Sequence, residues 1–298
     1  MQHIEKWRET LIDPIKIKFP CGVKVVEILS YPHAGNDVFI CNIMYEGHNH
    51  LGILKVERHC DANLRHEYKY LQLLNSNIHV NVPRVFSYGN IDDLTYMFIE
   101  YEEGDKLSTI VYEIEEENKV KTSIEYMMKF GENLSRIHNL KLVNEIAVER
   151  KFQKIMNEEQ SKTIGLGNVN KWLHENKPKD TSYCFIHGDH HHANILWKNM
   201  KIECTLDWEL CGIGWREFDI AWSIILRPNQ IFLKSQIEID AFLKGYSKYN
   251  SFNINHFNYC MVLGYQYFFE IARKSKNEDY EMFIRSEINR FSKHILMS

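Results

Sequence analysis

The chain has 298 residues, which is enough for two lobes or one large domain. Its 26% charged and 44% hydrophobic residues are ordinary for a globular protein and exclude a disordered or fibrous chain. The 36 Lys and Arg residues against 40 Asp and Glu residues give a formal net charge of −4, which argues against a general nucleic-acid binder because such proteins carry a basic surface.

The N-terminal third of the chain has the pattern of a β-sheet. Residues 1–15 place Ile4, Trp7 and Leu11 on one helical face and predict a short amphipathic helix. Apolar residues at spacings of three and four predict a second helix over residues 64–75. Segments rich in β-branched and aromatic residues predict five strands, at 24–29, 38–45, 51–56, 82–88 and 96–101.

After Gly104 the apolar period becomes helical, and residues 231–296 predict two or three helices. One strand pair interrupts this part, with strands at 194–197 and 202–206 joined by a turn at 198–200. We therefore expect an α+β protein with two lobes, residues 1–101 and residues 102–298.

The cysteines and the apolar runs indicate the compartment. The chain has seven cysteines and no Cys-x-x-Cys pair, which fits free thiols in a reducing cytoplasm. We interpret the closest pair, Cys204 and Cys211, as buried small side chains. Residues 1–14 are too polar for a secretory leader, and the longest nearly apolar run, 220–226, is too short to span a membrane. We expect a soluble cytoplasmic protein, a monomer or weak dimer, that binds neither nucleic acid nor membranes.

The most informative segment runs from residue 184 to residue 197 and contains His-Gly-Asp-x4-Asn, in which the acid is Asp189 and the amide is Asn194. The hairpin that follows returns the chain to Asp207, so we expect Asn194 and Asp207 to be neighbours. Mg²⁺ prefers one or two carboxylates, an amide oxygen and the phosphates of a nucleotide as ligands. Asp207 and Asn194 therefore fit a metal site, and Asp189 fits the base that accepts the proton of an attacking hydroxyl.

His-Gly-Asp-x4-Asn followed by Leu-Asp-Trp-Glu resembles the catalytic and metal-binding loops of the aminoglycoside phosphotransferase and choline kinase superfamily, small-molecule kinases related to protein kinases. The resemblance implies a protein-kinase-like fold in which the small lobe has a five-stranded antiparallel sheet and one helix, and the other lobe is mostly helical. It implies ATP or GTP and Mg²⁺ as cofactors. It also implies that Asp219 is structural and holds the loop after the metal site.

The same resemblance assigns nucleotide contacts in the N-terminal part. Lys55, on a predicted strand, would bind the phosphates and pair with Glu67 on the predicted helix. The turn at Gly35 resembles a short phosphate loop, although an ordinary hairpin turn explains it nearly as well. The adenine base would contact the backbone of Glu100 and Glu102. Apolar contacts with the adenine base would come from Ile53, Leu196 and Leu206, although ordinary core packing explains these residues equally well.

Two other interpretations compete with a kinase. His187 and the run 190–192 could bind a metal, but neighbouring residues of a regular element point apart and no His-Glu-x-x-His motif is present. A catalytically inactive kinase-like binding protein is the second, and it is weakened by the presence of Lys55, Asp189, Asn194 and Asp207.

The acceptor is a small molecule with a hydroxyl group, and an aminoglycoside-type antibiotic or related amino sugar is our first expectation. Choline, ethanolamine or another amino alcohol is the alternative. Its support is a set of tryptophans that could cage a quaternary ammonium and a spacing of charged residues similar to choline kinases. These residues are Trp172, Trp208, Trp215 and Trp222, with Glu209, Arg216 and Asp219.

Overall fold

The computed structural model describes residues 7–20, 22–32, 34–59, 62–77, 79–142, 145–149, 151–179 and 182–293. The chain forms two compact units. The first consists of Met1–Gly104 and Glu203–Glu209, and the second of Asp105–Ile202 and Leu210–Ser298. Within the described ranges, no helix combines the length and the hydrophobicity that crossing a membrane requires.

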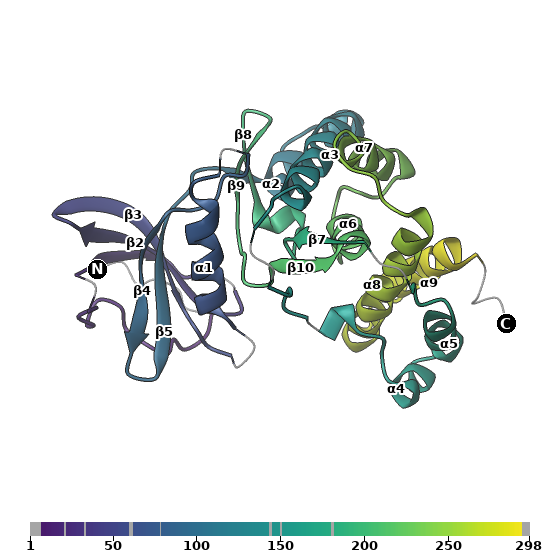
Figure 1. The fold of residues 1–298 in the computed structure, drawn as a ribbon, viewed down its shortest axis with the longest axis horizontal. Helices are drawn as coiled ribbons and strands as arrows, with labels where there is room; N and C mark the ends of the chain where they lie inside the picture. The colour runs from purple at the N-terminus through teal and green to yellow at the C-terminus, as the bar shows by residue number, and fades with distance from the viewer. Residues whose placement is uncertain are drawn as a thin grey trace. The chain divides into compact units, whose positions relative to one another are not determined.

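The first unit contains the predicted five-stranded antiparallel sheet, in the order β1-β2-β3-β5-β4. Its strands are β1 (Lys24–Ser30), β2 (Asp37–Tyr45), β3 (His48–Val56), β4 (Val85–Ile91) and β5 (Leu94–Glu100). The predicted helix is α1 (Leu64–Leu74), which lies against β4 and β5 (Figure 1). The side chain of Asn63 caps its first turn by accepting a hydrogen bond from the N–H of His66 at 3.0 Å.

Alternation along β2 and β3 builds the core on one face of this sheet. Phe39, Cys41 and Ile43 on β2 are fully buried, as is Leu54 on β3. Burying such a side chain stabilises the fold by about 1.5–3 kcal/mol. Lys55, next to Leu54 along the strand, points to the opposite face because successive side chains alternate.

The structure differs from the sequence prediction at the start of β4. The strand begins at Val85, where it pairs with Ile99, and not at residue 82. Pro83 has no N–H to donate to a strand neighbour, so the preceding residues leave the ladder. The carbonyl of Asn81 instead accepts a hydrogen bond from the N–H of Thr205 at 2.9 Å.

The predicted helix over residues 1–15 is wrong in its described part. Residues 7–15 form no helix, and residues 1–6 lie outside the described ranges. Trp7 stacks on Tyr31, with ring centroids 5.9 Å apart. The N–H of Leu11 donates to the carboxylate of Asp37 at 2.7 Å. The N–H of Leu11 and the ring of Trp7 are thus used in tertiary contacts, and in a helix they would point in other directions.

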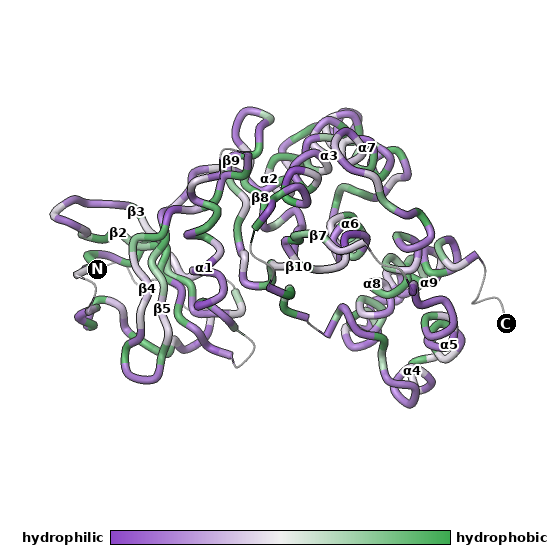
Figure 2. The backbone as a smooth tube through the Cα atoms, in the orientation of Figure 1, coloured by the Kyte–Doolittle hydropathy of each residue, from purple (hydrophilic) through white to green (hydrophobic). Residues whose placement is uncertain are grey.

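The second unit is mostly helical, as predicted. The long helices α3 (Glu116–His138) and α7 (Gln236–Tyr246) pack together, and α8 (Ile254–Ser275) packs on α6 (Arg216–Ile224) and α9 (Glu278–Ser292). Figure 2 shows hydrophobic and hydrophilic residues alternating along these helices. The shorter helices are α2 (Leu107–Tyr112), α4 (Glu158–Thr163), α5 (Gly167–Glu175), and the 3₁₀ turns η1 (Lys151–Gln153) and η2 (His192–Asn194).

Short strands carry the chain to the informative segment. β7 (Tyr183–Ile186) pairs with β10 (Gly212–Trp215), and β6 (Asp105–Lys106) pairs with β8 (Ile195–Lys198). The predicted hairpin is confirmed, because β8 turns through Asn199 and Met200 into β9 (Lys201–Thr205). The described cysteines form no disulfide bonds, and Cys204 and Cys211 are buried as predicted.

Candidate active site

Lys55 and Glu67 form a buried ion pair in the first unit. The Nζ atom of Lys55 lies 2.6 Å from Oε1 and 2.9 Å from Oε2 of Glu67. The Glu67 side chain is 1% exposed and that of Lys55 is 14% exposed. Burial alone would lower the pKa of Lys55, but the carboxylates of Glu67 and Asp207 raise it above its ordinary value. The lysine is therefore a permanent cation in a fixed position.

Asp207 belongs to the same cluster. Its Oδ1 lies 3.5 Å from Nζ of Lys55, and its side chain is 38% exposed. The backbone of Asp207 has a φ of +65°, a left-handed conformation that Asp adopts more readily than most residues. The next residue, Trp208, is fully buried and donates its indole N–H to the carbonyl of Thr205 at 2.8 Å. This anchor holds the turn and leaves the carboxylate of Asp207 accessible.

The turn that resembles a phosphate loop is held from the N-terminal segment. Arg8 donates to the carbonyls of Gly35 at 3.0 Å and Asn36 at 2.8 Å, and to the carboxylate of Asp37 at 3.1 Å. Arg58 donates to the same carboxylate at 2.9 Å. Asp37 is fully buried; burial would raise its pKa, but hydrogen bonds from Tyr31, Leu11 and Arg58 lower it.

The residues predicted to contact adenine in the first unit lie in β3, in β5, and close after each of β5 and β9. The N–H of Glu100 donates to the carbonyl of Arg84 at 2.8 Å, so only its carbonyl could serve a base. Among the described residues, no partner is found for the N–H of Glu102. Ile53 and Leu206 are partly buried. Roles for these residues remain predictions.

Asp189 lies in the second unit directly after β7. Its Oδ1 accepts a hydrogen bond from the indole N–H of Trp222 at 2.6 Å. Asn194 donates to the Asp189 carbonyl at 3.0 Å and to Oδ2 at 3.4 Å, and Nε2 of His191 lies 3.6 Å from Oδ2. The carboxylate is 23% exposed. Burial would raise its pKa, but His191, Arg227 and Trp222 together lower it, so Asp189 is ionised at neutral pH.

The segment that carries Asp189 is fixed by Asp219. This carboxylate accepts hydrogen bonds from the N–H groups of His187 at 2.9 Å and Gly188 at 3.0 Å, and from His138 at 3.2 Å. The structural role predicted for Asp219 was therefore assigned to the wrong loop. It holds the segment before Asp189, because α6 packs its first turn under the end of β7.

Gly188 is required by this geometry. Its φ is +83°, and a Cβ atom there would lie 2.5 Å from the carbonyl oxygen of Leu210. Any larger side chain at this position would clash with the backbone of Leu210.

The histidine run does not form a metal site. His190 is fully buried, stacks on Phe130, and hydrogen-bonds Ser223 at 2.8 Å and Asn133 at 3.0 Å. The described residues include no group of three or more His, Cys, Asp and Glu side chains that could hold a metal. His190 is a core residue, and the competing metal interpretation has no support in the described ranges.

Two of the candidate tryptophans, Trp208 and Trp222, do not provide a free aromatic cage. Trp208 is fully buried. Trp222 is 5% exposed, its N–H is bonded to Asp189, and one face lies 4.1 Å from the ring of Phe152. The guanidinium of Arg227 lies 4.9 Å from the Trp222 centroid, so a cation already occupies that ring.

Asn194 offers an oxygen that suits a hard cation. Its amide nitrogen donates to Asp189, which leaves the amide oxygen available as a ligand. Asp207 supplies carboxylate oxygens of the same kind. The donor types fit Mg²⁺, and the metal role of both residues remains a prediction. Leu196, on β8, is 8% exposed.

Sequence reasoning missed Arg227, Arg8 and Arg58, and it named Trp222 only as part of an aromatic cage. The place of Trp222 beside Asp189 could have been found, because it follows Asp219 by one helical turn and so shares its face. Arg8 and Arg58 could not be found from a sequence pattern, because each contacts Asp37 from more than 20 positions away.

Comparison with known proteins identifies the family. The family model described as "Phosphotransferase enzyme family" (APH) matches residues 50–252, more than half of the chain. No curated protein sequence matches significantly.

Solved structures match along most of the chain. Aminoglycoside phosphotransferase APH(4)-Ia, in a ternary complex with AMP-PNP and hygromycin B, has a TM-score of 0.63 and 13% identity over 91% of this chain and 94% of that one. Aminoglycoside-3'-phosphotransferase of type VIII has a TM-score of 0.59 and 16% identity over 81% and 93%. The gentamicin complex of APH(2'')-IIa has a TM-score of 0.55 and 15% identity over 92% of both chains.

These likenesses confirm the predicted kinase-like fold, and the family match confirms the predicted resemblance. The chain belongs to the APH phosphotransferase enzyme family and is a small-molecule kinase.

Proposed function

We propose that the protein transfers the γ-phosphate of ATP to a hydroxyl group of a small molecule, with Asp189 as the base. The observation that carries the proposal is the state of this carboxylate. It is ionised, partly exposed and held by Trp222, and Asp219 fixes the backbone before it. A carboxylate placed in this way suits a reaction that depends mainly on positioning.

Lys55 would bind the α and β phosphates, and Glu67 would hold the lysine in place. The short ion pair and the raised pKa of Lys55 support this role, because both keep the cation charged and aimed. The adenine base of ATP would contact the carbonyl of Glu100 and the N–H of Glu102. Its apolar contacts would come from Ile53, Leu196 and Leu206. A structural neighbour binds AMP-PNP, which supports ATP as the donor.

Asn194 and Asp207 would hold Mg²⁺, which when bound neutralises charge on the phosphates. Among the chain's own groups, Asp189 orients the acceptor hydroxyl. Its Oδ1 is engaged by Trp222 at 2.6 Å, so Oδ2, with only long contacts, is the atom that accepts the proton. Its lowered pKa makes it a weak base, which is consistent with removal of the proton late in the reaction.

An aminoglycoside or related amino sugar is the acceptor that the names of the structural neighbours support. Choline and other quaternary amines are less favoured, because Arg227 already covers a face of Trp222. The protein would be a cytoplasmic enzyme.

The test compares Asp189→Asn with Asp207→Asn in an ATP titration and in a turnover assay against aminoglycosides, macrolides, choline and amino alcohols. Asp189→Asn should lower kcat by roughly 10²–10⁴ and keep nucleotide binding. Asp207→Asn should weaken binding of Mg²⁺–nucleotide itself. Near-normal turnover of Asp189→Asn would remove its catalytic role, and failure of the wild type to consume ATP with any acceptor would favour an inactive binding protein.

A further inference from the structure

Arg227 is a partly buried cation without an ion-pair partner among the described residues. It follows α6, and its guanidinium donates only to the backbone carbonyls of Ile225 at 3.3 Å and Trp222 at 3.2 Å. Among the described residues, no carboxylate oxygen lies within 4.0 Å of the guanidinium nitrogens of Arg227, the distance that an ion pair requires. Even a cation that is only partly removed from water loses some of its hydration, and a ligand of opposite charge would compensate that loss. This arrangement is typical of a residue whose partner is a ligand.

Arg227 and Asp189 meet at one indole ring. The guanidinium lies 4.9 Å from the centroid of Trp222, and the N–H of the same ring donates to Asp189 at 2.6 Å. The charge of Arg227 also contributes to the lowered pKa of Asp189. A group bound by Arg227 would therefore lie close to the residue that we propose as the base.

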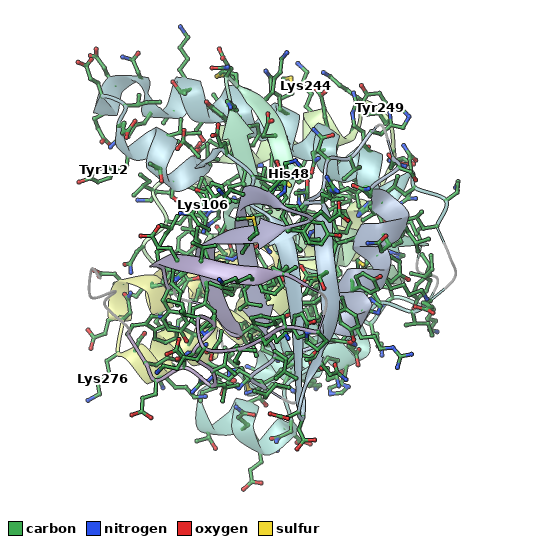
Figure 3. All side chains as sticks on the ribbon, turned by 90° about the vertical axis from the view of Figure 1, so that its left-hand side faces the viewer. His48, Lys106, Tyr112, Lys244, Tyr249 and Lys276 are labelled. Atoms are coloured by element: carbon green, nitrogen blue, oxygen red, sulfur yellow. The ribbon has the colours of Figure 1, made fainter. Side chains whose placement is uncertain are left out.

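A pocket of about 540 Å³ opens beside Arg227. Ser108 and Thr109 of α2 line it with hydroxyl groups, and His192 lines it with a buried Nδ1 atom that lacks a hydrogen-bond partner. Tyr112, at the end of α2, is 78% exposed and projects from the surface (Figure 3). None of the lining residues that the structure describes is Asp or Glu.

Two positive charges, those of Arg227 and Lys106, act on the lining residue His192. Burial lowers the pKa of Arg227 to about 10, which still leaves it cationic at neutral pH. Burial lowers the pKa of His192, and the positive charge of Lys106, just before α2, lowers it further, as the charge of Arg227 also does. Glu270 is a second negative charge in this region, because, in addition to burial, it raises the pKa of Tyr267 together with Asp189. Its carboxylate already accepts hydrogen bonds from Lys274 at 2.6 Å and from Lys151 at 3.2 Å. Glu270 is therefore not a free partner for a cationic acceptor.

We propose that this pocket binds an anionic group of the acceptor, a carboxylate or a phosphate, and that Arg227 is its main ligand. The proposal rests on the proposed phosphotransferase function and replaces the amino-sugar acceptor with a hydroxylated acid or a phosphate ester. It departs from the polycationic aminoglycosides named for the structural neighbours.

The binding test uses inorganic phosphate as the probe, followed by ³¹P line broadening and thermal shift on the full chain saturated with Mg²⁺ and AMP-PNP. Wild type should bind phosphate. Arg227→Gln should bind it roughly 10- to 100-fold more weakly, the range of a lost hydrogen bond to a charged group. Arg285→Gln is the matched control, because Arg285 pairs with Glu281 away from the pocket, and it should bind as wild type. Arg227→Lys should recover part of the loss and guards against misfolding of the glutamine variant.

Equal phosphate binding by wild type and Arg227→Gln would overturn the proposal. Competition between phosphate and AMP-PNP would also overturn it, since Arg227 would then serve the nucleotide's phosphates and not the acceptor.

The acceptor test compares kcat/KM for gluconate, glucose, glucosamine and kanamycin. We expect anionic before neutral before cationic acceptors, and an order that collapses in Arg227→Gln. Kanamycin as the best substrate would contradict the proposal. If no compound is phosphorylated, the proposed function fails, whereas phosphate binding still decides the role of Arg227.

Discussion

The carboxylate of Asp219 accepts a hydrogen bond from the backbone N–H of Gly188 at 3.0 Å, and this contact places Asp189. The two residues are distant in sequence, yet Asp219 is fully buried directly beneath the loop. The buried carboxylate accepts hydrogen bonds from three donors. Its loss would leave the N–H groups of His187 and Gly188 buried without an acceptor.

Asp219→Asn should therefore lower stability and turnover together. An amide would present an N–H to a group that also donates, and we expect a loss of at least about 2 kcal/mol in the free energy of unfolding. kcat should fall with little change in the KM for ATP. Denaturant unfolding and steady-state kinetics measure both. Asp240→Asn on the exposed side of α7 is the control and should leave both unchanged. An active, stable Asp219→Asn would contradict the role.

The Lys55–Glu67 pair predicts an effect on folding as well as on nucleotide binding. Sequence alone suggests that Lys55→Ala leaves folding nearly intact, but Glu67 is 1% exposed and would become an unpaired buried charge. Lys55→Met should raise the KM for ATP and destabilise the fold by about 3 kcal/mol. Lys55→Met combined with Glu67→Gln should recover much of the stability and none of the nucleotide affinity.

Thermal and denaturant unfolding with ATP titrations on the single and double variants check this prediction. If the double variant recovered ATP affinity, Lys55 would not be a phosphate ligand.

Arg8 predicts that the N-terminal segment affects nucleotide binding. Its guanidinium holds the carbonyls of Gly35 and Asn36, which orients the N–H groups of that turn. Arg8→Met should raise the KM for ATP roughly 3- to 10-fold, the equivalent of about one hydrogen bond. Arg58→Met is the control, because Arg58 bonds Asp37 and not these carbonyls. Equal effects of the two variants would mean that only the charge on Asp37 matters.

Most of the fold follows from local patterns, and most of the site geometry does not. Alternation predicted the strands around Leu54, and helical spacing predicted α1, because both depend on neighbours within a few residues. The helix predicted around Trp7 failed because contacts with Tyr31 and Asp37 outweigh a short amphipathic pattern.

The motif around Asp189 could be found because its residues are close in sequence. The residues that hold Asp189 in place could not be found in this way. Trp222 and Asp219 contact this segment from α6, and Arg227 belongs to no motif. Even the contact of Lys55 with Asp207 joins residues 152 positions apart. Spacing along the chain gives residue types and order, whereas these distances are set by packing.

Trp222 predicts a pH effect that a purely structural tryptophan would not produce. Its N–H donates to Asp189 at 2.6 Å and is one of the causes, with His191 and Arg227, that lower the pKa of this carboxylate. Trp222→Phe keeps an aromatic ring beside Phe152 and Arg227 and removes the donor together with the second ring of the indole. The pKa of Asp189 should rise, and the protonated, inactive form should then persist to higher pH.

We therefore expect the acidic limb of kcat to move to higher pH in Trp222→Phe, with kcat on the plateau lowered by roughly tenfold because the carboxylate is less well oriented. The measurement is kcat against pH from about 3.5 to 9 with saturating ATP and acceptor, because the pKa of Asp189 in the wild type lies below the ordinary value for Asp. Trp215→Phe is the matched control, since no hydrogen-bond partner of its buried indole nitrogen is found among the described residues, and its profile should coincide with that of wild type. If Trp222→Phe lowered kcat equally at every pH, the hydrogen bond would not tune Asp189, and Trp222 would act through packing alone.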